Sequence, residues 1–170
     1  MLENIILGFL MYGEMSGYDL KQRMVKSTSN FFDASFGTIY TALKRMEVKG
    51  AISSREVVDG GKLKKLYSIS ENGKSEFMNW LEQPVEFTRT KPDHLIKVFF
   101  LGFLPKDKAI EKLRAFIEEV EKVYLSLKKH ENQVKEVYDT YQFSTLVFGI
   151  NYYKYVIDWS NNLLSDLENR

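Results

Sequence analysis

The segment from Ser35 to Gly50 has the residue types that a helix needs in order to read double-stranded DNA. Small hydrogen-bonding side chains come first and basic side chains follow, which suits base edges in the major groove and phosphates along its rims. The candidate DNA-binding residues selected on this pattern are Ser35, Thr38, Tyr40, Thr41, Lys44 and Arg45. The segment alone also fits an amphipathic helix with a solvated polar face.

A second candidate group lies around the Gly60-Gly61 turn, where Lys62, Lys64 and Lys65 (the wing lysines) supply charges suited to backbone phosphates. Lysines also protect exposed strand edges, so these three could serve solubility and edge protection without any contact to DNA. The order of the segments favours DNA binding. A pair of helices, a third helix bearing threonine and tyrosine, and a lysine-rich hairpin follow one another along the chain.

The net charge of +1 does not by itself indicate a nucleic-acid partner, because only one face of a regulator has to be basic. Residues 35–67 contain seven Lys and Arg against three Asp and Glu, which gives this segment +4 and leaves the remainder of the chain at −3. Positive charge is therefore concentrated where the DNA-binding pattern lies.

The chain lacks the residue arrangements on which most enzymes depend. It has no cysteine, which excludes disulfides and thiolate chemistry and fits a reducing compartment. The two histidines, His94 and His130, have no partner at the spacing of metal ligands or of a catalytic triad. We expect no enzymatic activity, no metal site and no cofactor.

The longest apolar stretches fall well short of the roughly 20 residues that span a bilayer. The apolar N-terminal stretch has no basic residues before it and no small-residue cleavage site after it, so it does not resemble a signal peptide. We expect no membrane association and a cytoplasmic location.

Periodicity and capping predict a winged helix-turn-helix in residues 1–83. Expected are a helix over 2–12 that stops at Gly13, a helix that follows a Ser16 and Asp19 capping box, and a helix capped by Ser35. Two β-branched runs around Gly60-Gly61 predict a hairpin, and Ser70 caps a further helix.

Residues 84–91 form the expected linker, and residues 92–170 form an expected antiparallel helical dimerisation domain. A helix over 93–104 is predicted, with Leu95, Val98, Phe99 and Phe103 inward, and Pro105 as the first residue of the next helix. That helix carries a heptad seam from Ile110 to Tyr141, interrupted only at Glu131 and longer than one neighbouring helix needs to cover. The candidate dimerisation residues are Ile110, Leu113, Ile117, Val120, Tyr124, Leu127, Tyr153, Ile157 and Leu164.

Aromatic side chains make up 14% of the chain and have two interpretations. Planar ligands stack well on such rings, so a small aromatic effector could bind among them. The same residues could instead fill a core or a dimer interface. The residues concerned are Trp80, Trp159, Tyr152, Tyr153 and Tyr155.

Nearly the whole chain resembles the phenolic acid decarboxylase repressor (PadR) family. In the N-terminal half the resemblance rests on ILGFLMYGEMSGYDL, FFDASFGTIYTALKRMEVKGAI and KKLYSISENG. In the C-terminal half, PDHLIKVFFLGFL and YKYVIDWSNNLL are similar to the virulence-activator type of C-terminal domain.

The resemblance implies a dimeric DNA-binding repressor or activator. By position, Ser35, Gly37, Thr38, Ile39 and Tyr40 match the start of the recognition helix, and Lys64, Lys65 and Tyr67 match the wing. The resemblance thus adds Gly37, Ile39 and Tyr67 to the candidate DNA-binding residues. In many relatives a proline follows the glycine near the start of the second helix, where this chain has Glu14, Met15 and Ser16. An Arg-Pro pair is common in the wing, where this chain has Lys62 and Leu63. The second departure favours phosphate contact by the wing over a minor-groove arginine.

The sequence thus predicts a mainly α fold with a small β-hairpin. The predicted function is a regulator, with repression favoured, that binds a palindromic operator in double-stranded DNA as a homodimer. The alternative is a helical interaction module whose winged helix binds a protein partner.

Overall fold

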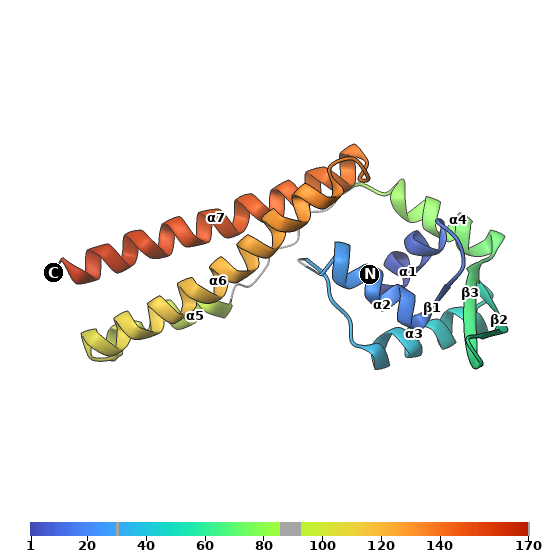
Figure 1. Ribbon diagram of the computed structural model, residues 1–170, viewed down its shortest axis with the longest axis horizontal. Coiled ribbons are helices and arrows are strands. Elements are labelled where there is room, and N and C mark those ends of the chain that lie inside the picture. Colours follow the sequence, from blue (N-terminus) through green and yellow to red (C-terminus); the bar gives the residue numbers. More distant parts are fainter. Residues whose placement is uncertain (30, 86–92, 170) are drawn as a thin grey trace. The chain divides into compact units, whose positions relative to one another are not determined.

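The structure, a computed structural model, describes residues 1–29, 31–85 and 93–169 and is mainly helical with a small antiparallel sheet (Figure 1). The chain divides into two compact units, one on each side of residues 86–92. Most of the predicted linker, residues 86–91, lies outside the described residues, so the domain boundaries stay a prediction. No described helix is long and apolar enough to cross a membrane.

The N-terminal unit contains the predicted three helices, the hairpin and a further helix. Its elements are α1 (Leu2–Leu10), β1 (Met15–Ser16), α2 (Gly17–Ser27), α3 (Phe36–Val48), β2 (Ile52–Asp59), β3 (Lys62–Ile69) and α4 (Glu71–Leu81). The strands are antiparallel in the order β1-β3-β2, and Met15 of β1 lies opposite Tyr67 of β3. Strand β1 was not predicted, because two residues are too few to show a pattern.

The predicted helix caps are confirmed. Ser16 and Asp19 form a capping box at α2, and the Ser35 hydroxyl accepts the backbone N–H of Thr38 at 3.2 Å. Ser70 accepts the backbone N–H of Gly73 at 3.0 Å at the start of α4. These caps satisfy backbone donors that a helix start leaves unpaired, so the serines fix where each helix begins.

One core joins the elements of this unit and orients α3. The buried side chains come from α1, α2, α3 and the sheet, and include Ile6, Leu7, Leu20, Met24, Ile39, Leu43, Met46, Ile52 and Tyr67. Burying one large aliphatic side chain stabilises the folded state by about 1.5–3 kcal/mol. The inward face of α3 is thereby fixed, and its other face meets solvent.

The C-terminal unit contains α5 (Asp93–Phe99), the short 3-10 helix η1 (Leu101–Phe103), α6 (Lys106–Val134) and α7 (Thr140–Glu168). Helices α6 and α7 pack side by side as an antiparallel pair (Figure 1). Pro105 is the N-cap of α6, so this helix starts at Lys106, one residue after the predicted start. The predicted helix over 93–104 is wrong at its end, since α5 stops at Phe99.

Side-chain burial in this short region also differs from the prediction. Leu95, Phe99 and Phe103 are exposed, and Val98 is half-buried. The physical reason is that α5 is only seven residues long. A helix of two turns offers one narrow strip to its neighbours, and the change to 3-10 geometry after Phe99 alters the periodicity on which the prediction relied.

The predicted continuous seam from Ile110 to Tyr141 is wrong as well. Helix α6 ends at Val134, and Tyr141 lies in α7, where it is exposed. Asp139 and Gln142 form a capping box that starts α7. This local capping signal ends the heptad pattern, because it begins a new helix that folds back on α6.

Candidate nucleic-acid interface

The outward face of α3 carries the side chains that the sequence selected first. Ser35, Gly37, Thr38, Thr41 and Lys44 are all exposed. The hydroxyls of Ser35 and Thr38 lie 2.7 Å apart, and the Thr41 hydroxyl donates to the Gly37 carbonyl at 2.8 Å. A hydroxyl has two acceptor lone pairs besides its donor, so these groups keep capacity for an external partner.

Two residues assigned to DNA contact by the resemblance cannot reach it with their side chains. Ile39 is 0% exposed and Tyr67 is 6% exposed, and both belong to the core. Burial raises the pKa of the Tyr67 hydroxyl, although nearby Lys65 opposes the change. Ile39 and Tyr67 therefore support the interface from inside, by filling the space beneath α3 and β3.

Tyr40 joins α3 to the start of α2. Its side chain is 48% exposed, and its ring lies so close to Gly17 that an added Cβ there would meet two ring carbons at 2.7 Å. The sequence analysis did not identify Gly17, because the two residues are far apart along the chain. About half of the Tyr40 side chain thus stays exposed despite this contact.

Ion pairs attach the wing to the helices. The ammonium of Lys64 lies 3.2 Å from the carboxylate of Asp19 in α2, and that of Lys65 lies 3.0 Å from Glu47 in α3. The Glu47 carboxylate also accepts the hydroxyl of Ser54, and the hydrogen bonds from Ser54 and Lys65 lower its pKa. Strands β2 and β3 are thus tied to α3 at one carboxylate.

Further basic residues of the 35–67 segment pair with carboxylates near the N-terminus. Arg45 and Lys49 both contact Glu3, and Arg55 contacts Glu14. Lys44 is exposed and has no ion pair among the described residues. The segment is less positive at its surface than its composition indicates. Exposed pairs contribute only about 0–1 kcal/mol, so a phosphate can displace them.

The structure adds two aromatic residues that the sequence analysis did not select. Tyr18, near the start of α2, and Phe36, the first residue of α3, have ring centroids 6.1 Å apart and stacked planes. Both are exposed. The signal in the sequence was the position of Phe36 between Ser35 and Thr38, two residues that had been selected.

The predicted dimerisation residues fall into two groups in the structure, one buried and one half-buried. Leu113, Ile117, Val120 and Leu127 are buried within one chain. The others, Ile110, Tyr124, Tyr153, Ile157 and Leu164, are half-buried. The argument that the seam exceeds one neighbouring helix is wrong, because α6 and α7 each have 29 residues and α7 pairs with α6 in the same chain.

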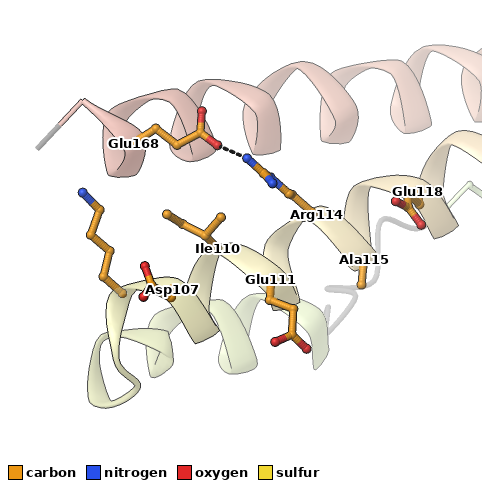
Figure 2. A pocket seen from close by; sticks show the side chains of 8 residues that line it. Asp107, Ile110, Glu111, Arg114, Ala115, Glu118 and Glu168 are labelled. Carbon is orange, nitrogen blue, oxygen red and sulfur yellow. Dashed lines mark hydrogen bonds and ion pairs between the residues drawn. The ribbon is translucent and has the colours of Figure 1, made fainter.

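A surface recess of about 770 Å³ lies between the start of α6 and the end of α7. Figure 2 shows its mainly charged lining, with an ion pair of 2.6 Å between Arg114 and Glu168. None of the aromatic residues considered for an effector lines it. Among those residues, Tyr152 and Tyr155 are exposed on α7, and Trp80 belongs to α4 of the other unit.

The histidines lie apart and take part in packing. The ring of His94 stacks on Phe116, with centroids 5.4 Å apart, and His130 Nε2 lies 3.0 Å from the Tyr138 hydroxyl. Within the described ranges, no three His, Asp or Glu side chains form a group that could hold a metal ion.

Comparison with known proteins gives two matches that together extend over most of the chain. Residues 6–79 match the Transcriptional regulator PadR-like family, and residues 90–168 match the Virulence activator alpha C-term family. The negative transcriptional regulator PadR of Bacillus subtilis (strain 168) is 35% identical over 111 residues, which are 64% of this chain and 60% of that protein. The matched region thus spans less than two thirds of this curated relative.

Solved structures match over almost the full length. The PadR-like transcriptional regulator BC1756 from Bacillus cereus has a TM-score of 0.88 at 28% identity and covers 99% of both chains. Bacillus subtilis PadR in complex with operator DNA has a TM-score of 0.89 at 24% identity, over 98% of this chain and 97% of that one. The same protein in complex with p-coumaric acid has a TM-score of 0.81 at 22% identity, over 98% of both chains.

Proposed function

We propose, from the premise that the chain belongs to the PadR-like family of transcriptional regulators, that it binds an operator in double-stranded DNA and regulates transcription as a homodimer. One observation carries this proposal. Helix α3 is fixed by a buried face, while its first turns present Ser35 and Thr38 to solvent. A helix with an exposed face and small polar residues at its amino end is the element that reads base edges in the major groove.

The residues of the interface divide into readers and anchors. Thr38, in the first turn, is placed to contact a base edge, whereas Lys44, two turns later, is placed to contact a phosphate. The wing lysines are point charges and suit phosphates in the same way. A two-fold dimer presents two copies of α3 to successive major grooves, so the operator is an imperfect palindrome.

Repression is the proposed mode, since a dimer bound across a promoter blocks polymerase. The curated relative is a negative regulator, which supports this choice. A regulator of transcription acts where the DNA is, so the cytoplasm is the proposed compartment. Regulation by DNA binding needs no catalytic activity, and no enzymatic activity is proposed. A small aromatic effector is proposed because Bacillus subtilis PadR has a complex with p-coumaric acid. Titration of p-coumaric acid into the protein and its operator should release DNA if this chain responds to that class of ligand.

The main experiment is selection of bound fragments from genomic DNA, followed by mobility shifts over a salt series. We expect a selected palindrome and a loss of binding with salt whose logarithmic slope is about −0.9 per neutralised phosphate. Thr38→Ala should relax preference at one or two positions, at about 1–3 kcal/mol for each lost base contact. Lys44→Ala, the matched control on the same helix, should weaken all sequences alike. Failure to bind any duplex would favour the protein-partner alternative.

The homodimer is proposed to form through the C-terminal unit. The half-buried candidates Ile110, Tyr124, Tyr153, Ile157 and Leu164 remain available at its surface. Exposed Phe99 and Phe103 extend the apolar surface of this unit, and their replacement does not disturb the buried core. The double change Phe99→Ser and Phe103→Ser should therefore shift sedimentation towards a folded monomer. A dimer of unaltered affinity would remove α5 and η1 from the interface.

A further inference from the structure

The stacked pair formed by Tyr18 and Phe36 is exposed beside the residues proposed to read DNA. Tyr18 is 57% exposed and Phe36 is 42% exposed, and their ring planes differ by 18°. Neither residue belongs to the core cluster of the N-terminal unit. The fold of this unit is held by a core of buried side chains to which these two rings do not belong, so the pair is free to meet an external partner.

The position of Phe36 in α3 determines which part of a bound DNA the aromatic pair can contact. Phe36 lies between the N-cap Ser35 and the exposed Thr38, in the first turn of α3. Next to it Gly37 has no side chain, and a Cβ built there would find only the Ser35 hydroxyl, at 3.9 Å. Phe36 and Tyr40, four residues apart, share one face of α3, so the exposed Phe36 ring lies beside another candidate DNA-binding residue.

We propose that the Tyr18 and Phe36 pair recognises the C5 methyl group of a thymine in each operator half-site. This inference rests on the proposed function and names part of its operator. Thymine is the base that presents an apolar group in the major groove, and phenylalanine is among the side chains that contact it. The phenyl ring of Phe36 supplies neither a charge for phosphate nor a strong donor for a base edge. Phe36 is the contacting residue, and Tyr18 is a positioning residue that supports its ring.

The test uses the full chain and the operator obtained by selection, in which each thymine is replaced in turn by uracil. Uracil keeps every hydrogen-bonding group and lacks only the methyl group. Wild-type protein should bind about fourfold more weakly when the contacted thymine is replaced in one half-site only, the effect expected for one buried methyl, and about 15-fold more weakly when it is replaced in both. Phe36→Ala should weaken binding to the thymine operator and bind the thymine and uracil forms equally.

Two further variants separate contact from support. Tyr18→Phe keeps the stacked ring and should keep the discrimination between thymine and uracil, whereas Tyr18→Ala should reduce it. Phe31→Ala removes another exposed ring of this unit and should leave the discrimination unchanged. Circular dichroism checks that each variant is folded.

The proposal is overturned if no uracil replacement weakens wild-type binding, or if folded Phe36→Ala retains the full discrimination. In both cases the protein still binds its selected operator, so the proposed function stands. Loss of binding to every duplex by wild-type protein would instead overturn the proposed function. Unchanged DNA affinity in folded Phe36→Ala would also overturn the proposal.

Discussion

Replacing Gly17 by alanine tests whether the contact with Tyr40 positions α3. Gly17 is the first residue of α2 and does not have a positive φ, so alanine fits its backbone without strain. Alanine is the better helix former, by up to about 1 kcal/mol in a helix interior. The added Cβ, however, would lie 2.7 Å from two carbons of the Tyr40 ring, so the ring has to move.

The two effects have opposite signs and can be separated. Overpacking typically destabilises by about 1–3 kcal/mol, which exceeds the helix gain, so Gly17→Ala should lower the free energy of unfolding. In a Tyr40→Ala background the ring is absent and only the helix gain remains, so Gly17→Ala should be neutral or stabilising. Urea unfolding of the four proteins should give a coupling energy of about 1–3 kcal/mol.

The same variants should differ in DNA binding. Gly17→Ala displaces the ring of Tyr40, itself a candidate DNA-binding residue, without removing a charge, so operator affinity should fall while the salt slope stays that of the wild type. The reasoning is refuted if the stability effects of Gly17→Ala and Tyr40→Ala add to within about 0.5 kcal/mol, the range expected of independent sites.

Gly73→Ala should destabilise the folded protein by about 3 kcal/mol or prevent folding, because the added Cβ would lie 2.0 Å from the Ala51 carbonyl oxygen, a backbone atom that cannot move aside. An unchanged midpoint of urea unfolding would contradict this contact. Hydrogen bonds from Ser54 and Lys65 lower the pKa of Glu47 from 4.5, so its contribution to stability is present above pH 4.5 and is lost as pH falls through the lowered pKa. Urea midpoints of wild type and Glu47→Gln should therefore differ at pH 7 and converge in acid; a constant difference would argue against the linkage. Changing the wing lysines together to alanine should weaken selected and random DNA by similar factors and flatten the salt slope, and an effect confined to the selected site would mean that the wing reads bases.

The sequence by itself determined the elements that depend on neighbouring residues. Ser16, Ser35 and Ser70 cap helices at the predicted positions, because a cap involves side chains and N–H groups only three residues apart. The turn at Gly60 and Gly61, both with positive φ, joins the predicted hairpin. Local chemistry was therefore enough to place α2, α3, the wing and α4 along the chain.

Only the tertiary structure decided which of the selected side chains are available. The resemblance assigned Ile39 and Tyr67 to DNA contact, but the core takes both side chains. In the C-terminal unit the heptad pattern continued past the end of α6, and the capping box at Asp139 divided it. Periodicity shows which residues share a face, but it does not show which other element covers that face.

The net charge at the surface of the interface also depends on the tertiary structure. Composition makes residues 35–67 strongly basic, yet Arg45 pairs with Glu3 from 42 residues away, and Arg55 with Glu14 from 41 residues away. These carboxylates lie in segments that a local count of charge leaves out. The packing of α1 and of the segment before β1 brings them next to the basic residues. A sequence determines how many charges a segment carries, whereas the potential at its surface depends on distances that exist only once distant segments have packed together.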